Sequence, residues 1–265
     1  MNSERAGKIQ NQFEQACDGK DNWATNGFLQ TLLSVRTSLP YSTMFASMMV
    51  KDDSNCSQAM RAASLLFASA TIYKSPNQSS NILGTCRLPG ETMDSLDKWD
   101  GKDHAVVLFR GAAYRVMLFD RDGNHVPKEI ILHSIKLILN SEDDQDLSVS
   151  GFTSLDRPTW NQIRQGLKKR SDSCAAQEEI ESSIVVLALD SNDSPNNLAD
   201  QLKTITFSEQ LGQRYYDKTI NIVVFADGEA GCLFEHTATD GYTAAFFLET
   251  IHTIAKDIKL SLIHI

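Results

Sequence analysis

The residues best suited to chemistry form one hexad near the end of the chain, His236-Thr237-Ala238-Thr239-Asp240-Gly241. Histidine is the natural base near neutral pH, because its unperturbed pKa of about 6.5 leaves it largely neutral yet still basic. A carboxylate four residues on, followed by glycine, indicates a fixed loop that holds the imidazole and lets a substrate approach the backbone closely. The chemistry indicated is removal of a proton from a hydroxyl or thiol that attacks a thioester.

The elements around the hexad should place it at the end of a strand. Residues 219–225 are β-branched and apolar, Asp227-Gly228 is a hairpin turn signal, and residues 230–235 form a second short strand. After Gly241, apolar residues recur at spacings of three and four, which predicts a core-facing helix. These residues are Ala244, Phe247, Leu248, Ile251, Ile254, Ala255 and Ile258.

Asp240 would lie just before that helix, where the positive end of the helix dipole favours a carboxylate. A non-catalytic interpretation stays open from the residues alone. In it, His236 is an ordinary polar residue closing a strand and Asp240 an ordinary helix cap.

The context of the hexad resembles a known family. Residues 215–241 resemble the catalytic-histidine region of the choline/carnitine acyltransferases, in which a Glu-His pair follows an Asp-Gly hairpin, and an acid and glycine follow the histidine. Further similar elements occur upstream in the family's order: Trp23 with Arg36 and Leu39-Pro40, residues 58–63, residues 86–90 (Cys-Arg-Leu-Pro-Gly), residues 104–108, and residues 151–160. The chain then divides into an N-terminal helical extension (1–19), an acyltransferase-like region (20–258) and a tail (259–265).

The resemblance implies reversible transfer of an acyl group between the coenzyme A thiol and the hydroxyl of carnitine or choline, a reaction of fatty acid metabolism. It implies that His236 acts as general base in both directions, supported by Gly241 and by Asp240, which would orient the loop and pair with an arginine. Acyl-CoA or CoA enters as a co-substrate rather than as a tightly bound cofactor. The residues that bind CoA stay unassigned.

The family is considerably longer than this chain, and its second half supplies lysines facing the CoA phosphates and the residues that bind the carnitine carboxylate. The expectation is therefore a half-built active site, incomplete in fold. Two alternatives follow. One is a truncated, non-catalytic protein that binds a partner chain or self-associates through the exposed half-site face. The other is a different CoA-dependent acyltransferase with the His-x-x-x-Asp-Gly pattern, such as a chloramphenicol acetyltransferase-like or condensation enzyme.

Composition and charge exclude several classes of protein. The chain has 265 residues, 42% of them hydrophobic and 22% charged, which is enough for a real core. A net charge of −9 argues against nucleic acid as a partner. No apolar run approaches the roughly 20 residues of a transmembrane helix, and no signal, transit or peroxisomal address is recognisable, so cytoplasm is the default location.

Other candidate groups favour structural roles. Lys168-Lys169-Arg170 ends a helical pattern, which favours a solvated helix end over a phosphate site. No metal site is expected, because the strand between Cys232 and His236 separates these two side chains. The five cysteines, at 17, 56, 86, 174 and 232, are odd in number and scattered, which predicts reduced thiols. The other histidines, His104, His125, His133, His252 and His264, are expected to be structural or solvated.

The remaining pattern completes the fold class. Helices are predicted over 8–17, 24–35, 57–72, 127–139 and from about 156 to 170, strands over 104–109, 114–119 and 183–189, and polar loops over 141–146 and 190–197. Alternating strands and helices, with some strands in hairpins, predict an α/β layered fold whose mixed sheet is flanked by helices. The resemblance identifies this with the CoA-dependent acyltransferase (chloramphenicol acetyltransferase-like) fold.

Overall fold

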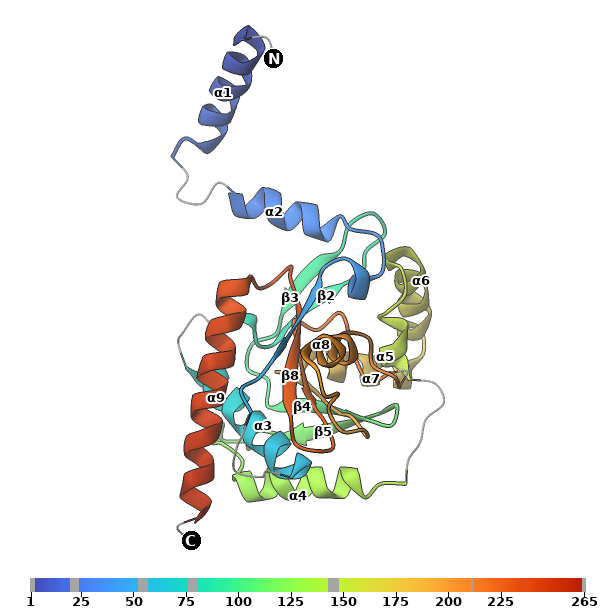
Figure 1. Ribbon diagram of the computed structural model, residues 1–265. Helices are drawn as coiled ribbons and strands as arrows, with labels where there is room; N and C mark the ends of the chain where they lie inside the picture. The colour runs from blue at the N-terminus through green and yellow to red at the C-terminus, as the bar shows by residue number, and fades with distance from the viewer. Residues whose placement is uncertain are drawn as a thin grey trace.

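The computed structural model describes residues 3–19, 24–51, 57–75, 81–142, 148–210 and 212–263. Figure 1 shows a central sheet with helices on both sides, helix α2 across one end of it, and helix α1 extending away. The helices are α1 (Ser3–Cys17), α2 (Ala24–Leu33), α3 (Gln58–Lys74), α4 (Lys128–Leu139), α5 (Val149–Phe152), α6 (Arg157–Lys168), α7 (Ser171–Ser182), α8 (Leu198–Phe207) and α9 (Gly241–Ile263), with a 3-10 turn, η1 (Leu39–Tyr41). The predicted α/β class with a mixed sheet flanked by helices is confirmed.

The main sheet has six strands in the order β1-β8-β7-β6-β4-β5. Their bounds are β1 (Met44–Met48), β4 (His104–Phe109), β5 (Ala112–Met117), β6 (Val186–Leu189), β7 (Ile220–Val224) and β8 (Ala230–Glu235). The central strands β4, β6 and β7 are parallel, whereas β5, β8 and β1 pair antiparallel at the two sides. A hairpin turn at Asp227-Gly228, where Gly228 has φ +84, joins β7 to β8 and so brings the end of β8 beside the start of β7.

Apolar residues alternate between the two faces of the sheet, as the period of a strand requires. Val107, Leu187, Ile222 and Phe234 face a core shared with α3, α4 and α9. The residues between them in the strands, among them Val106, Val186, Val223 and Leu233, face a second core with Ile180 of α7 and Ile205 of α8. Strands β4, β6, β7 and β8 are therefore buried on both faces, which gives the loop at the end of β8 a rigid base.

A small second sheet lies beside the main one. It consists of β2 (Thr85–Leu88) and β3 (Ser95–Lys98) in antiparallel register, and Cys86 makes an isolated bridge to Lys218, just before β7. This bridge brings Arg87 close to the strands that carry the hexad. Strands β1, β2 and β3, helices α5, α7 and α8 and the turn η1 are not among the sequence predictions. The predicted helices and strands are found with shifts of a few residues.

Within the described residues, the structure contains neither a candidate membrane span nor a candidate metal site. None of the helices within them combines the length and apolarity that crossing a bilayer requires. The same residues contain no group of three or more histidines, cysteines or carboxylates arranged to hold a metal ion. Trp23, Cys56 and His264, which the sequence interpretation named, lie outside the described ranges.

The buried thiol of Cys232 in β8 should make stability fall at alkaline pH. Burial raises the pKa of this thiol far above its ordinary value of 9.0. The folded state therefore keeps the proton that the unfolded state releases, so stability declines as pH rises above that value. The advantage of wild type over Cys232→Ala in the free energy of unfolding should shrink by about 1.4 kcal/mol per pH unit above pH 9, measured by urea unfolding.

Ile222→Val is the matched control, because Ile222 lies opposite Cys232 in the β7–β8 register. This substitution removes apolar volume without changing a titrating group. Its difference from wild type should stay constant over the same pH range. An equally constant difference for Cys232→Ala would contradict the prediction.

Candidate active site

His236 follows the last residue of β8, and its imidazole is held by the loop itself. Its backbone N–H donates to the carbonyl of Thr43, just before β1, at 3.0 Å. Nδ1 lies 2.8 Å from the carbonyl oxygen of Thr239. Because a carbonyl only accepts hydrogen bonds, Nδ1 carries the proton in this contact, and the neutral ring keeps its free lone pair on Nε2. Nε2 is therefore the nitrogen that can accept a proton.

Two aromatic side chains pack edge-on against this ring. Phe45 of β1 and Phe28 of α2 lie with their ring centroids 5.2 and 5.7 Å from the imidazole centroid, at interplanar angles of 65° and 67°. The imidazole is half-buried, and Phe28 itself is 51% exposed. The histidine is thus sheltered on two sides and accessible to a reactant.

Asp240 caps helix α9 rather than contacting the imidazole. Its Oδ1 accepts a hydrogen bond from the backbone N–H of Thr243 at 2.8 Å. This bond, with a further contribution from the nearby His236, lowers the pKa of the Asp240 carboxyl below its usual value. The carboxylate therefore fixes where the loop ends and the helix begins, while the carbonyl of Thr239 holds the ring.

Gly241 is the first residue of α9, and nothing in its local structure demands glycine. A Cβ atom built there meets no atom within 4 Å, and its φ is not positive. The space beside this residue is open to solvent. A substrate therefore has space to approach the backbone at Gly241. That it does so stays a prediction.

The residues on either side of His236 are joined to a buried arginine. Glu235 Oε1 accepts from Arg87 Nη1 at 3.0 Å and from Thr237 Oγ1 at 2.7 Å, and Oε2 accepts from the Thr237 N–H at 2.9 Å. Arg87 Nη1 also reaches Thr237 Oγ1 at 3.0 Å. Arg87 and Glu235 are fully buried, so this charge pair has no water to compete with it.

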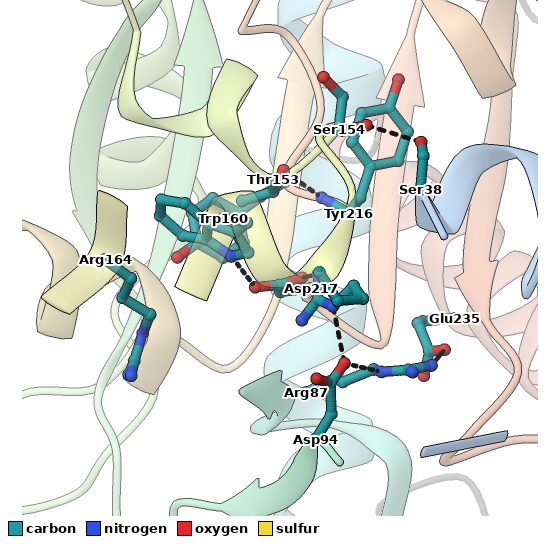
Figure 2. A network of polar contacts seen from close by, with 12 residues as sticks. Ser38, Arg87, Asp94, Thr153, Ser154, Trp160, Arg164, Tyr216, Asp217 and Glu235 are labelled. Atoms are coloured by element: carbon teal, nitrogen blue, oxygen red, sulfur yellow. Dashed lines mark hydrogen bonds and ion pairs between the residues drawn. The ribbon is translucent and has the colours of Figure 1, made fainter. Parts of the chain in front are cut away.

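Arg87 belongs to a larger cluster that centres on Asp94, as Figure 2 shows. Asp94 Oδ2 accepts from Arg87 Nε at 2.7 Å and from Arg157 Nε at 2.6 Å, and its Oδ1 accepts from Arg36 Nη1 at 2.7 Å. Arg157 in turn donates to Asp217 at 2.6 Å. We call the six residues Arg36, Arg87, Arg157, Asp94, Asp217 and Glu235 the ionic cluster; its three cations and three carboxylates balance.

The electrostatics of the cluster differ from one carboxyl to the next. Burial alone would raise the pKa of Asp94, but Arg157 and Arg87 outweigh it and hold that pKa below its ordinary value. Burial raises the pKa of Asp217 despite its bonds to Arg157 and to the indole of Trp160. Asp94, shared by the arginines, is therefore stabilised in its charged form.

A tight turn brings Asp94 back to Arg87. A Cβ atom at Gly90 would lie 2.0 Å from the carbonyl oxygen of Met93, so only glycine permits this approach. The Gly90 N–H then donates to Asp94 Oδ1 at 3.1 Å. The Arg-x-Pro-Gly element that the sequence analysis singled out is thus the element that builds the cluster.

The structure brings His236, Asp240 and Gly241 together, as adjacent parts of one loop and helix start. The sequence interpretation assigned no role to Arg87, Asp94, Asp217 or Glu235. The available signal was that Arg87, Glu235 and Arg157 all occur in the motifs that resemble the family, yet a motif does not say which of its residues touch.

The other predictions can be placed as well. His104 contacts Asp103 through Nδ1 and the carbonyl of Glu179 through Nε2, which confirms its structural role. Lys168, in the last turn of α6, and Lys169 and Arg170 after it are exposed, as predicted for a solvated helix end. The four described cysteines, Cys17, Cys86, Cys174 and Cys232, are free thiols, with Cys86 and Cys232 buried.

A mixed α/β sheet with a His-x-x-x-Asp-Gly loop at the end of a strand is the arrangement expected of the CoA-dependent acyltransferase fold. The comparison with family models then identifies the family: the model of choline/carnitine O-acyltransferases matches residues 1–261, and the chain belongs to that family.

Individual relatives are distant and much longer. Carnitine O-palmitoyltransferase 2, mitochondrial, from Macaca fascicularis is 28% identical over 176 residues, which cover 66% of this chain and 26% of that protein. Highly reducing polyketide synthase ltbA from Aspergillus luteorubrus is 30% identical over 166 residues, 62% of this chain and 5% of that protein. The chain thus matches about a quarter of the palmitoyltransferase and a small part of the synthase. Among solved structures, a chloramphenicol acetyltransferase is similar with a TM-score of 0.44 and 8% identity, covering 89% of this chain and 96% of that one.

Replacing Asp94 by asparagine should destabilise the fold strongly. The asparagine amide has one acceptor oxygen, whereas the Asp94 carboxylate has two, which accept hydrogen bonds from three arginines. The buried arginines therefore lose a counter-charge. The expected loss in the free energy of unfolding at pH 7 is about 3–5 kcal/mol, measured by denaturant unfolding. Because the pKa of Asp94 is lowered in the folded state, its contribution is complete above the ordinary carboxyl pKa of about 3.9 and disappears as pH falls through the lowered value.

The gap between wild type and Asp94→Asn should accordingly close in acid. Glu4→Gln, which breaks the exposed Glu4–Lys8 pair of α1, is the control and should change stability by less than about 0.5 kcal/mol. A similarly small effect of Asp94→Asn would show that the cluster is not a stabilising centre.

Proposed function

We propose that this chain carries the general-base region of a CoA-dependent O-acyltransferase acting on carnitine or choline. The observation that supports this most directly is the contact of His236 Nδ1 with the Thr239 carbonyl, because it leaves Nε2 as the free base at an accessible position. Membership of the choline/carnitine O-acyltransferase family supports the class of reaction. The carnitine acceptor is the one that the name of the palmitoyltransferase relative suggests.

In the proposed reaction, Nε2 of His236 takes the proton from the acceptor hydroxyl as its oxygen attacks the thioester carbonyl. The tetrahedral intermediate then collapses, the carbon–sulfur bond breaks, and the CoA sulfur leaves with the proton from the imidazolium. The reverse reaction starts with removal of the thiol proton by the same nitrogen. The imidazole is neutral at both ends of the cycle, so no covalent enzyme intermediate is needed.

The loop contributes by limiting which way the ring can turn. The Thr239 carbonyl stabilises the Nδ1–H tautomer and also the imidazolium that forms during the reaction. Asp240, four residues from His236, adds a negative charge nearby while it caps α9. We propose that Asp240 supports the imidazolium by its charge and the loop by its cap, and that an arginine pairs with its exposed side.

Exposed apolar side chains lie near the histidine. Phe28 contacts the imidazole, and the first turns of α9 present Tyr242 and Phe246, which are 73% and 37% exposed. Surface of this kind favours association. We propose that a second copy of this chain or a partner chain covers this surface. The activity assay tests the second copy, since specific activity should then rise with protein concentration, whereas activity independent of concentration would exclude it.

Replacing His236 by alanine should lower the rate of acyl transfer by a factor of about 10² to 10⁴, the usual contribution of a general base. The assay follows release of CoA from acetyl-, octanoyl- and palmitoyl-CoA in the presence of carnitine or choline. Release that depends on both the acceptor and His236 supports the proposal and defines the substrates. His104→Ala is the matched control, because its ring serves the fold through Asp103 and Glu179.

Acceptor-dependent activity that His236→Ala retains would contradict the mechanism. Transfer only to acceptors that lack a quaternary ammonium group would support the alternative of a different His-x-x-x-Asp-Gly acyltransferase.

Replacing Gly241 by alanine should separate substrate access from folding. A Cβ at this position meets no protein atom, and alanine is the better helix former, so stability should be unchanged or rise by up to about 1 kcal/mol. If a substrate passes close to this backbone, the KM for acyl-CoA or acceptor should rise several-fold. Gly166→Ala in α6, another helical glycine with open space, is the control for both readouts. An unchanged KM in Gly241→Ala would exclude close approach at this residue.

A further inference from the structure

We propose that Arg87 and Glu235 are positioning residues for His236, and that the single guanidinium of Arg87 sets both the loop beneath the imidazole and the helix packed against it. This inference rests on the proposed function of His236. It assigns to the buried pair a role in catalysis that neither residue performs by touching a substrate.

Side chains on both sides of His236 hold its loop. Glu235 precedes His236 and Thr237 follows it, and the two side chains close a ring of hydrogen bonds around the histidine's own backbone. In this ring, both oxygens of the Glu235 carboxylate are used, one by the Thr237 N–H and one by the Thr237 hydroxyl. The backbone at His236 therefore has little freedom to rotate, which in turn fixes the direction of its Cα–Cβ bond.

The charge of Glu235 is balanced by Arg87. Glu235 is fully buried, and an isolated carboxylate in such a place is strongly disfavoured. Arg87 Nη1 provides the counter-charge at 3.0 Å, and Asp94 holds the opposite side of that guanidinium at 2.7 Å. The orientation of the Glu235 carboxylate thus depends on Arg87, and Arg87 is itself fixed by a second carboxylate.

Arg87 also holds the end of helix α2. Arg87 Nη2 donates to the carbonyl of Leu32 at 2.8 Å and to that of Val35 at 3.3 Å, at the carboxyl end of α2. Leu33 is the one residue of this helix that is buried, so the contacts at its end do much to hold it. Phe28, one turn earlier, is the side chain that packs on the imidazole. Arg87 therefore acts on His236 through two elements, the loop that carries it and helix α2.

The chain offers a matched pair for the experiment. Arg164 and Glu181 also form a buried, two-point ion pair, at 2.7 Å for each contact, but they join α6 to α7 and make no contact with the His236 loop. Glu235→Gln and Glu181→Gln change the same chemistry in the two places. Both remove one buried negative charge and keep the side-chain shape.

The experiment measures kcat and KM for acyl transfer in both variants, together with the tautomer of His236. The tautomer is read from two-bond ¹H–¹⁵N correlations of the ¹⁵N-histidine chain, with His236→Ala identifying the signal. We expect Glu235→Gln to lower kcat at least about tenfold with KM changed less than about threefold, since a misplaced base loses rate rather than binding. We expect its Nδ1–H tautomer population to fall, and Glu181→Gln to resemble wild type in both readouts.

Thr237→Val is the second variant, used if Glu235→Gln does not fold. It removes only the hydroxyl that Arg87 and Glu235 share, and it should shift the tautomer in the same direction by a smaller amount. A folded Glu235→Gln or Thr237→Val with unchanged kcat and unchanged tautomer overturns the inference.

The two proposals fail in different ways. If wild type itself transfers no acyl group to any acceptor, the proposed function fails, and the tautomer alone still decides whether Arg87 and Glu235 position the ring. If His236-dependent transfer is present and Glu235→Gln leaves it intact, the function stands and the positioning role is wrong.

Discussion

The structure depends on one buried guanidinium, that of Arg87, which lies between the carboxylates of Asp94 and Glu235. Without counter-charges, a buried arginine would be prohibitively costly, and with two carboxylates but no further cation the site would carry excess negative charge. Arg157 and Arg36 restore the balance by sharing Asp94, and Asp217 balances Arg157. The cluster therefore has to assemble as a whole, and it draws together β2, α6, the start of β7 and the end of β8.

Burying so many charges is a poor way to gain stability, because well-packed apolar residues of similar volume often serve equally well. What charges with directional hydrogen bonds provide is a unique geometry. In this protein that geometry is imposed beside a half-buried histidine, at the junction between a rigid sheet and the first turn of α9. A base that must present Nε2 to a reactant benefits from such fixing, since small errors in placement reduce rate steeply.

Much of the fold followed from local patterns. The apolar period of α9, the Asp-Gly hairpin between β7 and β8, and the strands β4 and β5 were readable because periodicity and turn residues act over a few positions. Strands β2 and β3 escaped because each has four residues with polar side chains among them, and β1 escaped because Met44–Met48 contains no β-branched residue. The polar α7 and the helix α8 behind a polar loop gave equally weak signals.

For the site, the hexad and its order were recognisable, but the contacts were not. The sequence placed Asp240 just before α9 as a residue that orients the loop, and the structure has it capping that helix, because a carboxylate at the start of a helix accepts from the free N–H groups there. The group that holds the ring is a backbone carbonyl, which every residue has and no pattern reveals. Likewise, the pairing of Arg87 with Glu235 joins residues 148 positions apart.

The most direct measurement is the protonation of the His236 ring in the wild-type chain near pH 8, by two-bond ¹H–¹⁵N correlation with His236→Ala to assign the signal. Nδ1 is expected to carry the proton, and Nε2 to have the chemical shift of an unprotonated ring nitrogen. A ring protonated mainly on Nε2 would contradict this expectation, because the nitrogen proposed as the base would then have no lone pair to offer.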